Sequence, residues 1–170
     1  MERIIVGTDF SRSSEEAVQV AGEWARAYDA ELTLVHVLGV PELAHYEVEQ
    51  PIREHRELEE AVHEALDAME ERLLEDVRSR TAIVRGHGQI GASAAEGIVA
   101  LADDLDVDLI VVSTHGKSGL TRLLLGSVAE RVARSAGRPV LTVPVGATSR
   151  PRRVGRTARR RSKPPPSLQP

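Results

Sequence analysis

The 170-residue sequence contains no cysteine, and this absence removes several classes of protein. Disulfide frameworks, zinc fingers, iron–sulfur clusters and thiol catalysis all need cysteine, so histidine and carboxylate side chains are the remaining candidates for metal ligands. Aromatic residues are also scarce, with one Phe, one Trp and two Tyr. We therefore expect an aliphatic core and no stacking platform for single-stranded nucleic acid.

Long hydrophobic runs are absent as well. No apolar segment approaches the ~18 residues of a membrane span. The N-terminal sequence MERIIVGTDF lacks the basic flank, apolar stretch and cleavage site of a signal peptide. We therefore expect a cytoplasmic protein with no membrane-spanning segment.

Positive and negative charges are unevenly distributed along the chain. All 26 acidic residues and 14 of the 22 basic residues lie in 1–149, which gives this part a formal charge of −12. Residues 150–170 carry the other eight basic residues, five prolines and no acid, so this segment is +8. Because the segment has few apolar side chains to bury, we predict a globular domain over 1–147 and a disordered basic, proline-rich tail over 148–170.

Short apolar runs alternate with helical periodicity through the globular part. Strands are predicted at 4–6, 32–37, 82–84, 108–112 and 140–143, and helices at about 12–28, 53–79, 94–105 and 128–136. Strands that are apolar on both faces and alternate strictly with helices predict an α/β fold, an open parallel sheet with helices on both faces.

The first predicted helix carries two further signals. Ser13 and Glu16 have the spacing of a capping box at its start. Ala17, Ala21, Trp24 and Tyr28 recur at the spacing that places them on one helical face.

Polar and small residues gather at the carboxyl ends of the predicted strands, where open parallel sheets bind their ligands. These residues are Thr8, Asp9, His36 and Val37 at the first two strands, and Ser113, Thr114, His115 and Gly116 at the fourth. Gly126 and Ser127 then stand immediately before the fourth helix. Free N–H groups, the helix dipole and a serine hydroxyl together suit phosphate oxygens, so this point is predicted to bind an anion.

These residues resemble the universal stress protein family over essentially all of 1–146. The similar blocks are VGTDFS at 6–11, LVHV at 34–37, DLIVVSTHGKSGLTRLLLGSVAERV at 108–132 and RPVLTV at 138–143. The resemblance implies a Rossmann-like five-stranded sheet of order 3-2-1-4-5 and a homodimer paired through the last strand, 139–145. In one branch of the family it also implies ATP, held by the loop after the fourth strand.

The nucleotide-binding branch of that family shows a glycine, two residues, a second glycine, nine residues and then Gly-Ser or Gly-Thr. This chain matches from Gly116 to Gly126 and Ser127, but it has Ser113 in place of the first glycine. The added side chain would cost affinity if the backbone there needs a positive φ or a very close approach to the ligand. The retained second half favours the nucleotide-binding branch.

The resemblance also implies which residues bind the nucleotide. Asp9 and Val37 would flank adenine and ribose, and Gly126 and Ser127 would meet phosphates. The full implied set is Thr8, Asp9, Val37, Val112, Ser113, His115, Gly116, Gly126, Ser127 and Val128. The ligand would be ATP, or ADP or AMP, and a Mg²⁺ could accompany the phosphates with Asp9 as the closest carboxylate. No transition-metal site is expected.

Several of these residues also have an ordinary structural explanation. Asp9 is typical of a turn or a helix cap, and Gly126-Ser127 could likewise be only an N-cap. His36, inside an apolar strand, suits a hydrogen-bonded core histidine, and His115 suits a tight turn more than a catalytic role.

Two classes of function follow. The first is a homodimer that binds ATP and acts as a stress-response regulator, with no catalytic residue. Slow ATP hydrolysis stays open because Arg122 and Arg131 could lie near the phosphates. The alternative is a nucleotide-free dimeric interaction protein whose pocket is vestigial because of Ser113. In either case the basic tail, 150–170, could bind nucleic acid or an anionic membrane surface, or dock on the acidic body.

Overall fold

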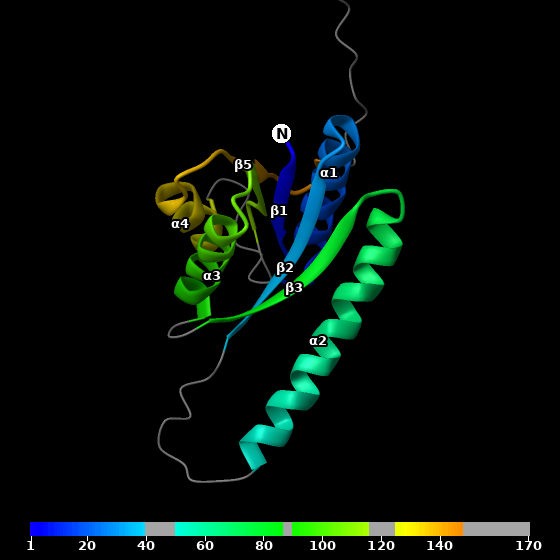
Figure 1. Cartoon of the computed structure of the whole chain (residues 1–170). Coiled ribbons are helices and arrows are strands. Elements are labelled where there is room, and N and C mark those ends of the chain that lie inside the picture. Colours follow the sequence, from blue (N-terminus) through cyan, green and yellow to red (C-terminus); the bar gives the residue numbers. More distant parts are fainter. Residues whose placement is uncertain (40–49, 87–89, 116–124, 148–170) are drawn as a thin grey trace, which may run out of the picture.

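The computed structural model describes residues 1–39, 50–86, 90–115 and 125–147, and it shows nine elements (Figure 1). They are β1 (Arg3–Gly7), α1 (Arg12–Tyr28), β2 (Glu31–Gly39), α2 (Gln50–Leu74), β3 (Ser79–Gly86), α3 (Ile90–Asp104), β4 (Leu109–Ser113), α4 (Ser127–Ser135) and β5 (Val140–Val143). The predicted tail, 148–170, lies outside the described residues. Within them, no helix is long and apolar enough to cross a membrane.

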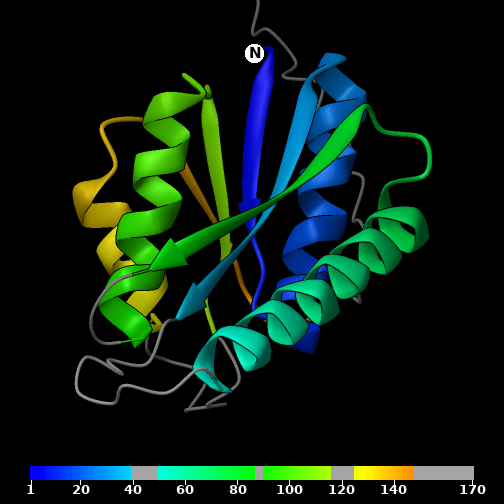
Figure 2. The ribbon, with the colours of Figure 1, turned by 60° about the horizontal axis from the view of Figure 1, so that its bottom comes forward.

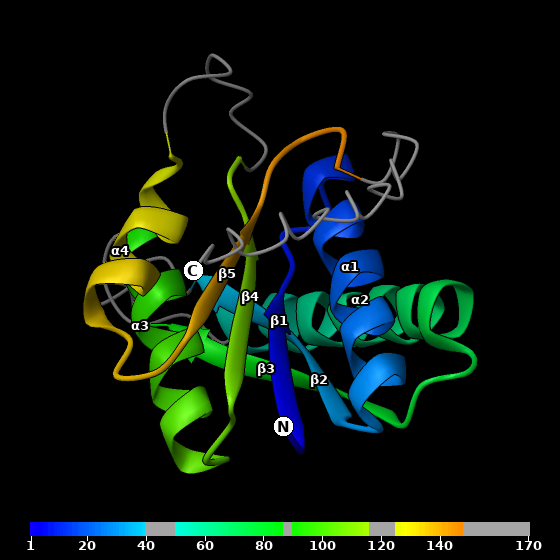
Figure 3. The same cartoon turned by 90° about the horizontal axis from the view of Figure 1, so that it is seen from above.

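The five strands form one parallel sheet in the order β3-β2-β1-β4-β5, which confirms the predicted fold (Figure 3). From β1 the chain steps outward to β2 and β3, and it then crosses back to place β4 and β5 on the other side of β1. In the central register, Ile5 lies opposite Thr33 of β2 and Ile110 of β4. The order therefore reverses between β1 and β4, and this reversal is where ligands bind in such sheets.

Both faces of the sheet are covered, α1 and α2 lying on one and α3 and α4 on the other (Figure 2). Alternate residues of a strand therefore enter different cores, because strand side chains point alternately to the two faces. In β1, Ile4 and Val6 pack toward α1 and α2, whereas Ile5 packs toward α3 and α4. Ile4, Ile5 and Val6 are all fully buried, which explains the continuous apolar run.

The buried face of α1 differs from the prediction. Ala17 and Ala21 are fully buried, but Trp24 is 37% exposed and Tyr28 is 54% exposed. The two aromatic rings stack on each other at a centroid distance of 5.8 Å. Small residues form the buried face instead, with Ala25 following Ala21, because α1 packs closely against β1 and β4.

The predicted capping box at the start of α1 is wrong. Ser11 is the N-cap, and its hydroxyl accepts a hydrogen bond from the Ser14 amide. Glu16 is buried, and its Oε2 accepts hydrogen bonds from the Gly146 and Ala147 amides, which follow β5. The N-terminal part of α1 therefore anchors the segment that follows β5.

Element boundaries differ most around α2. The helix was predicted over 53–79, but it begins at Gln50 and ends at Leu74, and β3 then starts at Ser79. Val77 continues the apolar stripe of the helix in sequence, and in the structure it packs on the same core from the connection to β3. Val77 is partly buried from the loop after α2, yet it falls at the helical spacing of the apolar residues before it. The apolar periodicity in the sequence therefore placed the end of the helix too late.

At the opposite end of the sheet from the strand carboxyl ends, Asp108 ties β4 to the N-terminus. Its Oδ2 accepts hydrogen bonds from the Glu2 amide at 2.6 Å and the Arg3 amide at 3.1 Å. These two bonds, the Glu2 bond first, hold the pKa of Asp108 below its usual value. A carboxyl whose folded-state pKa is depressed stabilises the fold above its unfolded pKa of about 3.9, and this stability is lost as the pH falls through the folded pKa.

Asp108→Asn is therefore expected to lower the thermal unfolding midpoint at pH 7, because an amide oxygen accepts backbone hydrogen bonds less strongly than a carboxylate. As the pH falls below about 3.9 the gap between variant and wild type should narrow, since the wild-type carboxyl becomes protonated as the pH passes through its lowered folded-state pKa. Thermal melts at pH 7, 5 and 3 measure both effects. Asp104→Asn, on the exposed end of α3, is the matched control. A constant gap across this pH range would contradict the assignment.

Candidate functional site

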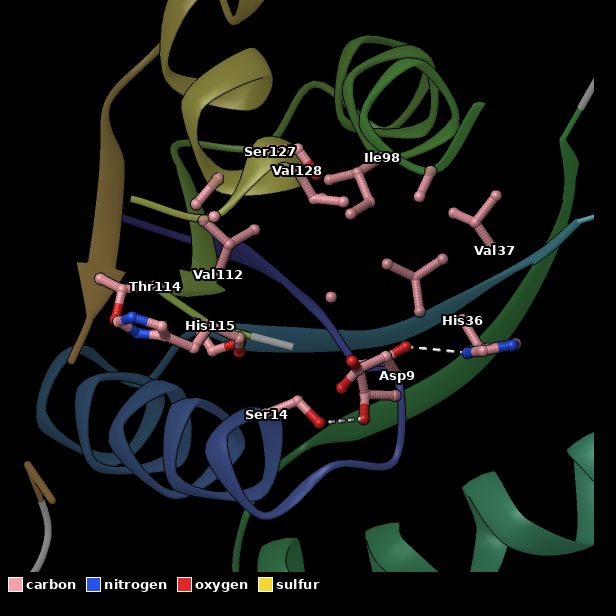
Figure 4. A pocket seen from close by; sticks show the side chains of 17 residues that line it. Asp9, Ser14, His36, Val37, Ile98, Val112, Thr114, His115, Ser127 and Val128 are labelled. Carbon is pink, nitrogen blue, oxygen red and sulfur yellow. Dashed lines mark hydrogen bonds between the residues drawn. The ribbon is translucent and has the colours of Figure 1, made fainter. Parts of the chain in front are cut away.

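A cavity of about 450 Å³ opens where the strand order reverses (Figure 4). It lies at the carboxyl ends of β1, β2 and β4 and is bounded by the N-terminal parts of α1 and α4 and by α3. Its volume falls in the range of about 300–1,000 Å³ that is typical of small-molecule sites. The lining residues are Gly7, Thr8, Asp9, Ser14, Val35, His36, Val37, Ala94, Ile98, Val112, Ser113, Thr114, His115, Gly126, Ser127, Val128 and Ala129.

The residues that the sequence marked as a binding set lie around this one cavity. Those that line it are Thr8, Asp9, Val37, Val112, Ser113, His115, Gly126, Ser127 and Val128. Gly116 lies outside the described residues, as does Arg122. Arg131 is exposed on α4 and does not line the cavity. Their contact with a ligand stays a prediction.

The turn after β1 is held by its own side chains. The Phe10 amide donates to the Thr8 hydroxyl at 3.0 Å, and the Ser11 amide donates to Asp9 Oδ1 at 3.0 Å. Within this turn, Phe10 has a φ of 61°, a left-handed conformation that is strained for a bulky residue. Asp9 therefore stabilises the turn, as its residue type suggested, and it also lines the cavity. Its contact with a ligand stays a prediction.

His36 secures the same turn from the neighbouring strand. Its Nδ1 lies 2.8 Å from the Thr8 carbonyl oxygen, which can only accept, so Nδ1 carries the proton and donates. The imidazole also packs against the Phe10 ring at a centroid distance of 4.7 Å. His36 is hydrogen-bonded, as the sequence suggested, but it is half-buried rather than part of the core, and it lines the cavity.

The connection from β4 to α4 is closed at its base by backbone hydrogen bonds. The Gly126 amide donates to the Thr114 carbonyl at 2.7 Å, and the Thr114 amide donates to the Val143 carbonyl of β5 at 2.9 Å. A Cβ on Gly126 would lie only 2.8 Å from the Thr114 oxygen. Glycine is therefore required here by close backbone approach; its φ is an ordinary −62°.

The N-terminus of α4 opens into the cavity through Gly126, Ser127, Val128 and Ala129. Gly126 is the N-cap and supplies no side-chain hydrogen bond to the first amides of the helix. The start of α1, by contrast, is capped by Ser11. The first N–H groups of a helix carry its positive dipole end and seek an acceptor, so the α4 terminus is suited to an anion.

Charged side chains contribute little to the cavity wall. Among the described lining residues there is one carboxylate, Asp9, there are two imidazoles, and there is no lysine or arginine. Backbone dipoles are therefore the main source of positive potential in the part of the site that the structure describes. No group of three or more His, Asp and Glu in the described ranges could hold a metal ion. A Mg²⁺ would thus need ligand phosphates beside Asp9.

Ser113 occupies its position without backbone strain. The left-handed φ angles at non-glycine residues of the described chain are at Phe10, Asp29 and Asp106, so Ser113 does not need the conformation that favours glycine. Its hydroxyl donates to the His115 carbonyl oxygen at 2.7 Å. The Thr114 hydroxyl, next to it, lies 2.9 Å from His115 Nδ1.

Sequence reasoning missed several lining residues. Ala94 and Ile98 lie in the helix predicted over 94–105 and were not among the expected site residues, yet they line the cavity from α3. Gly7 was not singled out, although a Cβ there would lie 2.8 Å from Ile98 Cδ1. In the sequence, Gly7 directly follows the large apolar residues of the first strand. A glycine at such a position often marks a close contact with another part of the backbone or with a side chain.

The fold and the site together define an α/β protein with a ligand cavity at the topological switch point, closed on one side by an uncapped helix N-terminus. Residues 1–144 match the model of the universal stress protein family. The chain belongs to this family.

Individual relatives agree with this assignment. The chain is 37% identical over 149 residues to universal stress protein MJ0531 of Methanocaldococcus jannaschii, covering 84% of this chain and 81% of that one. The solved structure of MJ0577, from the same organism, superposes with a TM-score of 0.71 at 32% identity, covering 84% and 95% of the two chains. A universal stress protein solved in complex with cAMP has a TM-score of 0.57 at 30% identity, with 84% and 95% coverage.

His36→Ala is expected to destabilise the fold by about 1–3 kcal/mol, because the buried Thr8 carbonyl loses its donor and the Phe10 ring loses its neighbour. Urea unfolding measures this loss. His63→Ala, on an exposed position of α2, is the control and should change stability by less than about 0.5 kcal/mol. Equal effects of the two substitutions would show that His36 does not secure the turn.

Proposed function

We propose that the protein binds an adenine nucleotide, ATP in the first instance, in the switch-point cavity, and that it acts in the stress response as a ligand-responsive homodimer. The observation that carries the proposal is the uncapped N-terminus of α4, which opens into the cavity beside Gly126. The cAMP complex of a relative supports an adenine nucleotide as the ligand class.

The two ends of the cavity suit the two ends of a nucleotide. Val37 lines the part near β2, and Ile98 of α3 and Val112 of β4 add further apolar surface (Figure 4). Such an apolar surface suits the faces of a purine ring, and Asp9 offers a carboxylate to ring or ribose donors. The α4 terminus, at the other end, offers N–H groups to phosphate oxygens.

Binding without turnover is the activity that this arrangement supports. Phosphoryl transfer needs an oriented nucleophile and added positive charge at the transferred group. The described lining residues supply neither an arginine nor a lysine, and the carboxylate of Asp9 accepts the Ser11 amide through one oxygen. We therefore assign no catalytic residue.

Gly126→Ala is expected to weaken ATP binding by at least about tenfold, equivalent to about 1.4 kcal/mol. The added Cβ would collide with the Thr114 carbonyl and shift the start of α4 away from its present position. Isothermal titration of nucleotide-stripped protein, with and without Mg²⁺, measures the effect, after mass spectrometry has identified any nucleotide released by denaturation.

Gly137→Ala is the matched control, since it adds the same methyl group just beyond the other end of α4, where a Cβ has no neighbour within 4 Å. It should bind ATP as the wild type does. Failure of the wild type to bind ATP, ADP or AMP at millimolar concentration would overturn the proposal and favour the alternative, a nucleotide-free dimeric interaction protein.

The dimer is proposed to form through β5 and its flanks, residues 139–145. β5 is an edge strand, and in the described residues it pairs only with β4. Edge strands need pairing or covering, and pairing with a second copy satisfies this need with two-fold symmetry. Val145, just after the strand, is 59% exposed, which leaves an apolar side chain for the interface.

Val145→Glu is expected to shift the protein from dimer to monomer without unfolding it, because the charge would be buried at the proposed interface. Light scattering coupled to size-exclusion chromatography measures the mass. Leu58→Glu is the control, since Leu58 is a 47% exposed apolar residue on α2. A wild-type monomer, or a dimer that survives Val145→Glu, would contradict pairing through this edge.

A further inference from the structure

Two serine hydroxyls from distant parts of the chain converge on one carbonyl oxygen at the cavity wall. The Ser13 hydroxyl, in the first turn of α1, donates to the His115 carbonyl at 2.7 Å, and the Ser113 hydroxyl donates to the same oxygen at 2.7 Å. A carbonyl oxygen has two lone pairs, and here both are used. Ser13 is 8% exposed, so this contact lies largely away from solvent.

The backbone that leads into His115 is fixed as well. The neighbouring Thr114 donates its amide to Val143 of β5 and accepts the Gly126 amide at its carbonyl. His115 itself lines the cavity, and its Cα lies 3.7 Å from the position that a Cβ on Gly126 would take. The carbonyl held by the two serines therefore belongs to the stretch of backbone that adjoins the N-terminus of α4.

We infer that Ser13 and Ser113 are positioning residues that together hold the His115 carbonyl toward α1 and so keep the anion end of the cavity receptive to phosphate. This inference rests on the proposed nucleotide site. A carbonyl oxygen carries partial negative charge and repels an anion at short range. The two hydroxyl donors hold the carbonyl oxygen away from the phosphate before the nucleotide binds. Less conformational entropy of the backbone is then lost on binding.

On this account Ser113 strengthens phosphate binding, whereas its departure from the glycine motif suggests that it weakens binding. If the glycine of the nucleotide-binding motif were optimal at this position, Ser113→Gly would tighten phosphate binding. Because the Ser113 hydroxyl holds the carbonyl, we expect Ser113→Gly and Ser113→Ala to weaken it and Ser113→Thr to retain it. Either hydroxyl can hold the oxygen alone, so the loss in the double variant should exceed the sum of the single losses.

The test compares AMP with adenosine by isothermal titration, since only AMP carries the phosphate. The AMP-to-adenosine affinity ratio should fall about twofold in Ser113→Ala and in Ser13→Ala, and tenfold or more in the double variant, where independent losses would give only about fourfold. Ser79→Ala is the matched control, because it removes a serine-to-carbonyl hydrogen bond at the start of β3.

A second measurement needs no ligand. Amide hydrogen exchange at Gly126 should accelerate in the double variant, because the backbone that accepts this amide loses its support, and it should not change in Ser79→Ala. An unchanged affinity ratio in the double variant, or tighter AMP binding in Ser113→Gly, overturns the inference while the nucleotide site stands. A wild type that binds neither AMP nor adenosine overturns the nucleotide site, and the positioning role falls with it.

Discussion

The hydrogen bond from the Gly126 amide to the Thr114 carbonyl, at 2.7 Å, is the interaction on which the rest of the site depends. It joins the end of β4 to the start of α4 across the intervening connection. The bond fixes where α4 begins, and only glycine permits the approach, since a Cβ would lie 2.8 Å from the same oxygen. As a result the first N–H groups of α4 face a cavity with no side-chain cap.

The sheet supplies the other half of the site. The strand order reverses between β1 and β4, so the turns that leave these strands diverge to opposite faces and open a space between them. The turn after β1 is shaped by Thr8, Asp9 and His36, and Phe10 is held in a left-handed conformation. Strained backbone of this kind persists where the surroundings determine it, and it recurs at binding sites.

The N-terminal part of α1 connects these two halves to the segment after β5. Ser13 holds the His115 carbonyl, and Glu16, one turn later on the same helix, accepts the amides of Gly146 and Ala147. The anion end of the cavity and the segment after β5 are therefore fixed by the same short piece of helix. Since β5 is the proposed dimer edge, the ligand site and the assembly site share one support.

Much of this architecture could be predicted from the sequence, because continuous apolar runs such as Ile4–Val6 mark strands buried on both faces. The polar residues at the strand ends then indicated the cavity. The predictions were wrong where a residue's hydrogen-bond partner lies far away in the sequence, or where helical spacing placed large side chains on a face that packs too closely to hold them. Glu16 was assigned to a local cap, although its partners lie 130 residues away. Trp24 and Tyr28 were placed on the face of the buried alanines because of spacing, yet they are 37% and 54% exposed.

The role of Ser113 could not be predicted from the sequence for the same reason, because it depends on contacts made in the folded protein. In the sequence it is a departure from a glycine motif, and the cost of that departure depends on a backbone angle and on a hydrogen bond to His115 that no local pattern encodes. Its partner in that contact, Ser13, lies 102 residues from His115, so the pairing becomes visible only in three dimensions.

The most direct test of the central claim is an amide chemical-shift titration of isotopically labelled protein with AMP. If the α4 terminus receives the phosphate, the amides of Ser127, Val128 and Ala129 should show the largest shifts and saturate together with those of Asp9 and Val37. Titration with adenosine should move Asp9 and Val37 but leave the α4 amides nearly unchanged. Saturating shifts that avoid residues 127–129 altogether, or no shifts at millimolar AMP, would contradict the account.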